Sequence, residues 1–197
     1  MDITATILCV FLIVFLGVFL INLLYILPYY ERMKRASQLL EKDKAEEYIS
    51  EIEGLLNTAK GESLRNSLKV NLSAGYIEAG QYSAAISILE NLSEKGKLPS
   101  SLKTPVYLNL CTSYLHLEQS DKAIALYHQS HDLFAKYKNS KEYGGNILVL
   151  DINIAIQEKR YEEASHMLDI AQKAYSGPRF QKAFQEIANI LENAKNM

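Results

Sequence analysis

The chain has no tryptophan, only two cysteines and four prolines in 197 residues, and no excess of charge of either sign. Its net charge is −2, so the electrostatic basis for nucleic-acid binding is missing and no nucleic-acid partner is expected. Cys9 lies in an apolar run and Cys111 in a candidate helix. A disulfide between them is therefore not expected, which fits a reducing compartment.

Charge is absent altogether between Ile3 and Tyr30. A bilayer core about 30 Å thick needs about 20 helical residues, and residues 5–27 supply them. Buried core helices are usually shorter and keep a polar stripe. We therefore expect residues 1–30 to form a transmembrane anchor in which residues 5–27 cross the membrane. Pro28 is expected to end or bend this helix.

A cleaved signal peptide is the alternative interpretation of this run. The chain begins Met1-Asp2 without a basic segment, and no small-x-small cleavage site follows the run. The basic residues Arg32, Lys34 and Arg35 come directly after it. The positive-inside rule then predicts a single-pass protein of the cell membrane, with its N-terminus outside and its C-terminal domain in the cytoplasm.

Three tyrosines mark the end of the apolar run. Aromatic side chains of this kind concentrate at the boundary between lipid and water. Tyr25, Tyr29 and Tyr30 are expected to lie there, on the cytoplasmic side.

The rest of the chain repeats itself. The segments Asn71–Ile86 and Asn109–Ile124 agree at several positions, and a third echo runs over Leu150–Ser165. Alanines recur in these echoes at 85, 123 and 164, with a weaker instance around Ala45. A supersecondary unit written several times along a chain is typical of a stacked helical array, and such arrays mostly bind other molecules.

The spacing within each echo points to a known family. Leu72, Ser73 and Tyr76 precede Ala85 with the spacing L-G-x-x-Y before A, and Leu110, Cys111 and Tyr114 precede Ala123 in the same way. This pattern resembles the tetratricopeptide repeat (TPR) family over residues 66–175. The resemblance implies paired helices in which small residues at repeat positions 8 and 20 allow close approach. The expected fold class is thus all-α, with a transmembrane helix followed by a short TPR-like α-solenoid.

The chain then divides into four parts. After the anchor we expect a degenerate first helical pair or linker over 31–61, TPR-like repeats over 62–177 and a C-terminal capping helix over 178–197. The capping helix is expected to turn Phe184, Ile187 and Leu191 inward. The helices are expected at 31–40, 43–59, 62–79, 82–95, 104–117, 120–137, 143–158, 161–175 and 179–194.

The resemblance also implies a binding groove. In TPR proteins the concave face is lined by repeat positions 2, 5, 9 and 12 of the first helix of each pair. The lining carried over to this chain is mostly apolar, which favours an amphipathic helix or an extended apolar peptide as partner. Only Asn153 matches the lysine and asparagine clamp for acidic tails. Packing of some groove residues against the chain's own helices stays an open alternative. The candidate groove residues are Val70, Ala74, Ile77, Leu108, Thr112, Leu115, Val149, Asn153 and Ile156.

No catalytic residue, metal site or cofactor is expected. His128 and His131 share a helix face, but no further ligands complete a metal site, and Gly144-Gly145 has no phosphate-binding lysine after it. The sequence thus predicts a membrane-tethered adaptor or scaffold that binds a protein or peptide, not an enzyme. One alternative is a structural or assembly subunit of a larger membrane complex, because Gly17 and Asn22 favour helix association in lipid. With reversed topology, the domain would instead be an extracytoplasmic chaperone-like helper.

Overall fold

The computed structural model describes residues 3–94 and 98–195. These residues form ten α-helices and no strand, which confirms the all-helical prediction. Most helices begin and end within two residues of the expected positions. The helices are α1 (Ile3–Glu41), α2 (Ala45–Thr58), α3 (Glu62–Glu78), α4 (Tyr82–Glu94), α5 (Ser100–His116), α6 (Ser120–Gln129), α7 (His131–Tyr137), α8 (Gly144–Gln157), α9 (Tyr161–Ala174) and α10 (Pro178–Lys195).

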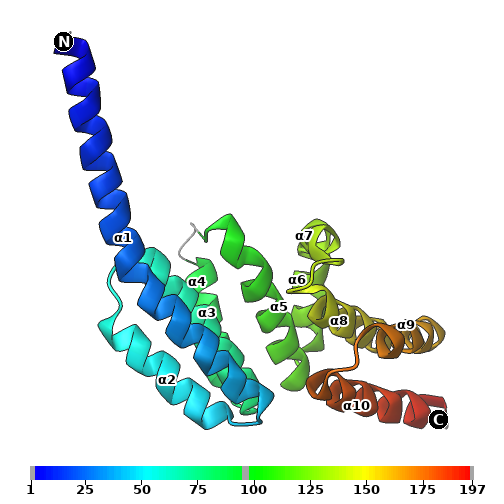
Figure 1. Ribbon diagram of the computed structural model, residues 1–197. Helices are drawn as coiled ribbons and strands as arrows, with labels where there is room; N and C mark the ends of the chain where they lie inside the picture. The colour runs from blue at the N-terminus through cyan, green and yellow to red at the C-terminus, as the bar shows by residue number, and fades with distance from the viewer. Residues whose placement is uncertain (1–2, 95–97, 196–197) are drawn as a thin grey trace.

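The helices lie in two layers (Figure 1). Helices α3, α5, α8 and α10 pack successively against one another, and the C-terminal part of α1 joins this inner layer through α3. Helices α2, α4, α6 and α9 form the outer layer. Helices α2, α4 and α9 pack against both of their neighbours in sequence, α6 packs against α5 and α8, and the short α7 also contacts α5 and α8. The layers are held by apolar side chains that recur along one face of each helix, since burial of that face is what stabilises an amphipathic helix in a domain.

Four turns from the inner to the outer layer share one backbone geometry. Each contains a residue with φ between 58° and 73°. The amide after that residue donates to the carbonyl oxygen five residues back, at 2.7–2.9 Å, which is the Schellman closure of a helix C-terminus. These turns make α1–α2, α3–α4, α5–α6 and α8–α9 equivalent helix–turn–helix units. The positive-φ residues of these four turns are Asp43, Gly80, Glu118 and Lys159.

Buried residues recur at fixed distances from these turns. Two positions in each unit are at most 3 % exposed. The position seven residues before the positive-φ residue is Ala36, Ser73, Cys111 or Ile152. The position five residues after it is Tyr48, Ala85, Ala123 or Ala164. The small ones allow the two helices of a unit to approach closely, as the repeat pattern predicts.

The first unit departs from the expected alignment. The turn geometry places Tyr48, rather than Ala45, at the position of the recurrent alanine. A tyrosine fits there because the next helix has Gly75 opposite it. A Cβ atom on Gly75 would lie only 2.7 Å from Cδ1 of Tyr48. Matching residue types alone therefore gave the wrong register in this unit.

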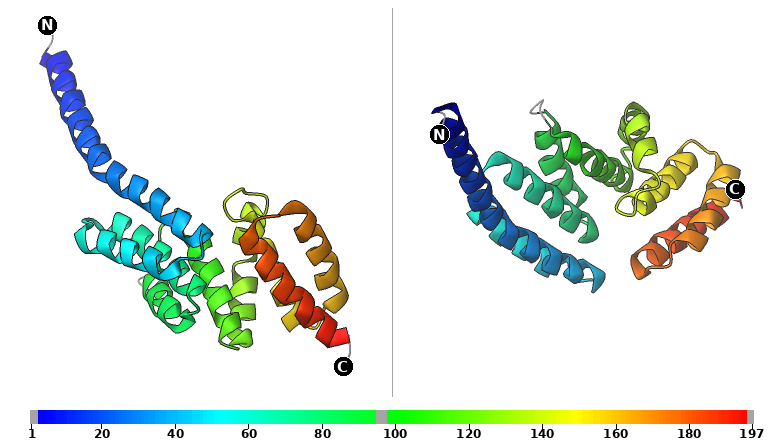
Figure 2. Two further views of the ribbon diagram at one scale, coloured as in Figure 1. Left: turned by 60° about the horizontal axis from the view of Figure 1, so that its bottom comes forward. Right: turned by 45° about the horizontal axis from the view of Figure 1, so that its top comes forward.

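Helix α1 does not end at Pro28. It continues to Glu41, so the separate helix expected at 31–40 is the C-terminal part of the apolar helix. Figure 2 shows that α1 bends between its projecting part and the part that packs on the domain. A proline inside a helix removes one backbone hydrogen bond and bends it, which was one of the two outcomes expected for Pro28.

Two other expected elements differ in extent. The helix expected over 120–137 is divided at Ser130 into α6 and α7. Helix α5 begins at Ser100, within the segment expected to be a loop, because Pro99 provides an extended residue before the helix and Pro105 is accommodated inside it.

Helix α10 closes the C-terminal end of the array. Phe184, Ile187 and Leu191 are buried against α8 and α9, as the sequence predicts. The ring of Phe180 occupies the place of a Cβ on Gly145, 2.5 Å from that position, and the carbonyl oxygen of Lys138 lies equally close to a Cβ on Gly144. The glycine pair is thus a packing requirement at the start of α8.

Candidate functional site

The N-terminal part of α1 is an exposed apolar rod (Figure 1). Its large apolar side chains are 41–72 % exposed, with Ile26 and Leu8 at the two extremes. Among the described residues, α1 is the one helix long and apolar enough to cross a membrane. An apolar surface this extended is stable only against another apolar surface or in lipid.

Two tyrosines join this rod to the domain. The backbone N–H of Lys60 donates to the hydroxyl of Tyr25 at 2.7 Å. The hydroxyl of Tyr29 lies 3.3 Å from Oγ1 of Thr58 and 3.3 Å from the hydroxyl of Tyr25. The turn between α2 and α3 therefore lies beside the end of the apolar run. Tyr30, by contrast, is 67 % exposed.

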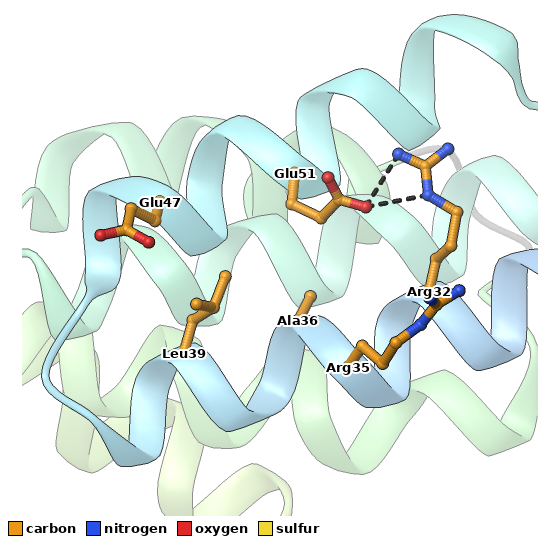
Figure 3. Close-up of a pocket in the computed structure, with 6 residues that line it drawn as sticks. All are labelled: Arg32, Arg35, Ala36, Leu39, Glu47 and Glu51. Carbon is orange, nitrogen blue, oxygen red and sulfur yellow. Dashed lines mark hydrogen bonds and ion pairs between the residues drawn. The ribbon is translucent and has the colours of Figure 1, made fainter.

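The basic residues after the apolar run line an open cleft between α1 and α2 (Figure 3). Arg32 donates to Oε1 of Glu51 through Nε and Nη2, both at 2.8 Å. Arg35 lies next to it, also on the cleft, and Lys34 is exposed on α1. Glu47, at the far end of the cleft, pairs with Lys44 at 2.6 Å. Exposed ion pairs such as these contribute at most about 1 kcal/mol to the stability of the fold. They therefore hold the two helices together only weakly at the cleft, which is a charged surface and not a rigid pocket.

The predicted groove residues divide by burial. Val70, Leu108 and Ile156 are buried in the hydrophobic core, at most 8 % exposed. Leu115 and Val149 are half-buried against the same core clusters. The remaining four, Ala74, Ile77, Thr112 and Asn153, are half-exposed on α3, α5 and α8.

The polar members of this set bond to their own helices. Oγ1 of Thr112 donates to the carbonyl of Leu108, and Nδ2 of Asn153 donates to the carbonyl of Val149, both at 2.9 Å. The apolar surface offered at these positions therefore comes from half-buried side chains, with the buried ones supporting it from beneath.

The turn geometry also assigns residues of α1 to positions equivalent to those of the predicted groove. Asp43 and Gly80 occupy the same place in their turns. The groove positions of the second unit, measured from Gly80, can therefore be transferred to the first unit by measuring the same distances from Asp43, and four further residues fall there. The Ala45 alignment missed them; the signal that would have found them is the helix C-terminal turn at Asp43. These residues are Tyr30, Met33, Ser37 and Leu40.

An aromatic pair joins the start of α4 to the end of α5. The rings of Tyr82 and His116 stack with centroids 4.3 Å apart and planes 3° from parallel. Partial burial lowers the pKa of His116, while the carboxylate of Glu186 on α10 acts in the opposite direction. The same carboxylate raises the pKa of Tyr82, after burial as the first cause. Helix α10 thus reaches back toward α4 and α5.

Tyrosine hydroxyls link successive units to one another. Tyr76 donates to Oε1 of Glu53 at 3.0 Å, and Tyr114, at the equivalent position of the next unit, donates to Oε1 of Glu90 at 2.7 Å. Burial, together with the nearby Glu90, raises the pKa of Tyr114. These bonds fix the stacking of the units, and the repeat pattern did not predict them.

The described residues contain no group of three or more metal-ligating side chains. Nε2 of His128 lies 2.7 Å from Oε1 of Glu158, and Nδ1 of His131 lies 3.3 Å from Oδ1 of Asp132. The two histidines therefore interact with separate carboxylates. Cys9 is exposed on α1 and Cys111 is buried in α5, and both are free thiols.

Comparison of the chain with protein-family models, with curated proteins and with solved structures found no match. The likeness to the TPR family stays a prediction from the residues.

Proposed function

We propose that this protein is a membrane-anchored TPR-like adaptor. Helix α1 holds it in the cell membrane, and the inner helix layer binds a short apolar segment of a protein partner. The domain lies in the cytoplasm.

The continuity of α1 carries this proposal. One helix contains both the exposed apolar rod and the inner-layer helix of the first unit, where Ala36 is 2 % exposed. A secretory signal would be cut from the chain near its apolar run. Here the residues after that run are helical and tied to α2 through Tyr25 and Tyr29. This arrangement favours a retained anchor.

The TPR-like interpretation is supported by the four Schellman turns and by the small buried residues on either side of them. In such an array, the inner helices face the bound peptide. Ala74, Ile77, Leu115 and Val149 are the partly exposed apolar residues at the groove positions, and they suit an amphipathic helix or an extended apolar strand of the partner. Anchoring gives the adaptor and a membrane-bound partner a high effective concentration for each other.

The orientation rests on Arg32, Lys34 and Arg35, which follow the apolar run. Protease treatment of sealed, right-side-out vesicles tests it: a cytoplasmic domain stays intact until the vesicles are opened. Digestion before opening would reverse the topology and move the domain outside the cytoplasm.

The groove is tested by capture of partners on the full chain in mild detergent, followed by mass spectrometry. Ile77→Asp changes a half-exposed groove residue that belongs to no buried cluster. Ile170→Asp is the matched control, since Ile170 is 48 % exposed on α9 of the outer layer. Loss of a captured protein with Ile77→Asp alone is the expected result. Equal capture by both variants would show that the inner layer is not the binding surface.

A further inference from the structure

We propose that the turn between α2 and α3 rests on the phospholipid head groups and limits how far α1 enters the bilayer. The proposal depends on the anchoring function proposed above. It adds a second contact with the membrane, made by the folded domain.

The position of the turn along α1 is the first observation. The N–H of Lys60 bonds to the hydroxyl of Tyr25, and Tyr25 precedes Leu27, the last residue of the apolar run. The turn is therefore level with the last helical turn of that run. Figure 1 shows it at the end of the domain from which α1 projects, whereas the turn between α1 and α2 lies at the opposite end.

This position changes the length of α1 available to the hydrocarbon core. A membrane boundary at Leu27 would bring the charged side chain of Lys60 to the edge of the hydrocarbon. A boundary at Leu24 leaves residues 5–24, and about 20 residues at 1.5 Å each still span a core of about 30 Å. Ile26, Leu27 and Tyr30 then lie at the depth of the head groups.

The turn is built to hold its shape against a surface. Nη1 of Arg65 donates to the carbonyls of Leu56 and Ala59, at 2.9 and 3.2 Å, and so braces the end of α2. Gly61 has a φ of 85°, which allows the sharp reversal into α3. Lys60, Gly61 and Glu62 remain exposed.

The chemistry of the turn suits phosphate. The ammonium group of Lys60 would meet lipid phosphates directly, while Arg32, on the same side of α1 as α2, is paired with Glu51 and adds no net charge. Basic groups close to an anionic membrane surface are attracted to it.

The absence of tryptophan gives a direct test with single-tryptophan variants of the full chain. Lys60→Trp reports the turn. Lys42→Trp is the matched control, because Lys42 is also exposed but lies at the opposite end of the domain-packed part of α1. Leu16→Trp reports insertion of α1. Each variant is reconstituted into vesicles of phosphatidylcholine and phosphatidylglycerol, with a nitroxide quencher either on the head group or on the acyl chain.

The expected result is loss of Lys60→Trp fluorescence with the head-group quencher while Lys42→Trp keeps its fluorescence. Tryptophan itself favours the interface, but that bias is the same in both variants. Equal fluorescence in the two, with Leu16→Trp quenched by the acyl-chain nitroxide, would overturn the head-group contact and leave the anchor intact. A Leu16→Trp variant unaffected by the acyl-chain nitroxide would overturn the anchor, and the head-group contact with it.

Discussion

The Sγ atom of Cys111 lies 3.7 Å from the carbonyl oxygen of Ala123. Both residues are fully buried, and they face each other across the two helices of one unit. This contact measures how closely α5 and α6 approach, and it makes the pair sensitive to added volume.

Ala123→Leu is expected to destabilise the protein by about 1–3 kcal/mol, because extra carbon atoms in a packed core displace their neighbours. Chemical unfolding of the full chain in detergent micelles measures the change. Ala125→Leu on the same helix is the control, since Ala125 is exposed, and its effect should stay within about 0.5 kcal/mol. Similar losses for both variants would contradict the close approach of the helices.

The thiol of Cys111 should be unreactive in the folded protein. Burial raises its pKa to about 12, so almost no thiolate forms at neutral pH. In a Cys9→Ser background, a maleimide should label the chain only after unfolding by denaturant. Rapid labelling of the folded chain would mean that α5 and α6 separate readily.

Substitution by alanine should lower the stability of the protein at a crowded glycine and raise it at an uncrowded one. Gly144→Ala is expected to destabilise by about 1–3 kcal/mol, because the backbone carbonyl of Lys138 occupies the space that the new Cβ needs. Gly54 lies inside α2 with no other atom within 4 Å of that place, so Gly54→Ala should stabilise by about 0.5–1 kcal/mol. Thermal unfolding of the two variants compares them, and a shift of equal sign would contradict this assignment.

Two substitutions at the turn residues with positive φ should have opposite effects on stability. Lys159 has a φ of 60°, and a side chain in this left-handed region costs about 1–2 kcal/mol. Glycine avoids that cost, but it also makes the unfolded chain more flexible, which cancels part of the gain. Lys159→Gly should therefore raise the free energy of unfolding by about 0.5–1 kcal/mol. Gly80→Ala, at the equivalent turn, should lower it by a similar amount. An unchanged stability in both would show that these turns relax without strain.

His116 should titrate below its ordinary pKa, because partial burial against Tyr82 disfavours the imidazolium. As the pH falls below the ordinary histidine pKa, the unfolded chain binds the proton first, so the contribution of this group to stability is lost; above that pH it is fully present. Resonances of the imidazole measure the titration. Glu186→Gln removes the opposing carboxylate and should lower the pKa of His116 further. An unchanged pKa would mean that α10 does not reach this ring.

The helices were largely predictable because their signals are local. Apolar spacing places the ends of most helices within a few residues, although α5 begins at Ser100 and was expected to begin at residue 104. The register of the first unit was not predictable from residue types, since Tyr48 replaces the alanine and only its contact with Gly75 explains it. The continuity of α1 through Pro28 depends likewise on its packing against α2 and α3.

The burial of the candidate groove residues could not be predicted from the sequence. Repeat positions identify the helix face on which Leu108, Leu115 and Ile77 lie. How deeply each is buried depends on how tightly α3, α5 and α8 pack together, which no local pattern encodes. The hydroxyl bonds between units, such as Tyr114 to Glu90, are also long-range and were missed for that reason.

The apolar rod and the inner-layer helix of the first unit are two parts of one continuous helix, so no loop separates them. In a bilayer, a helix longer than the hydrocarbon is thick tilts to fit it. Such a tilt would change the orientation of the whole helical array relative to the membrane surface. Bilayer thickness would then set the angle at which the inner helices meet a partner. A change in lipid composition that alters this thickness would therefore alter the geometry of binding.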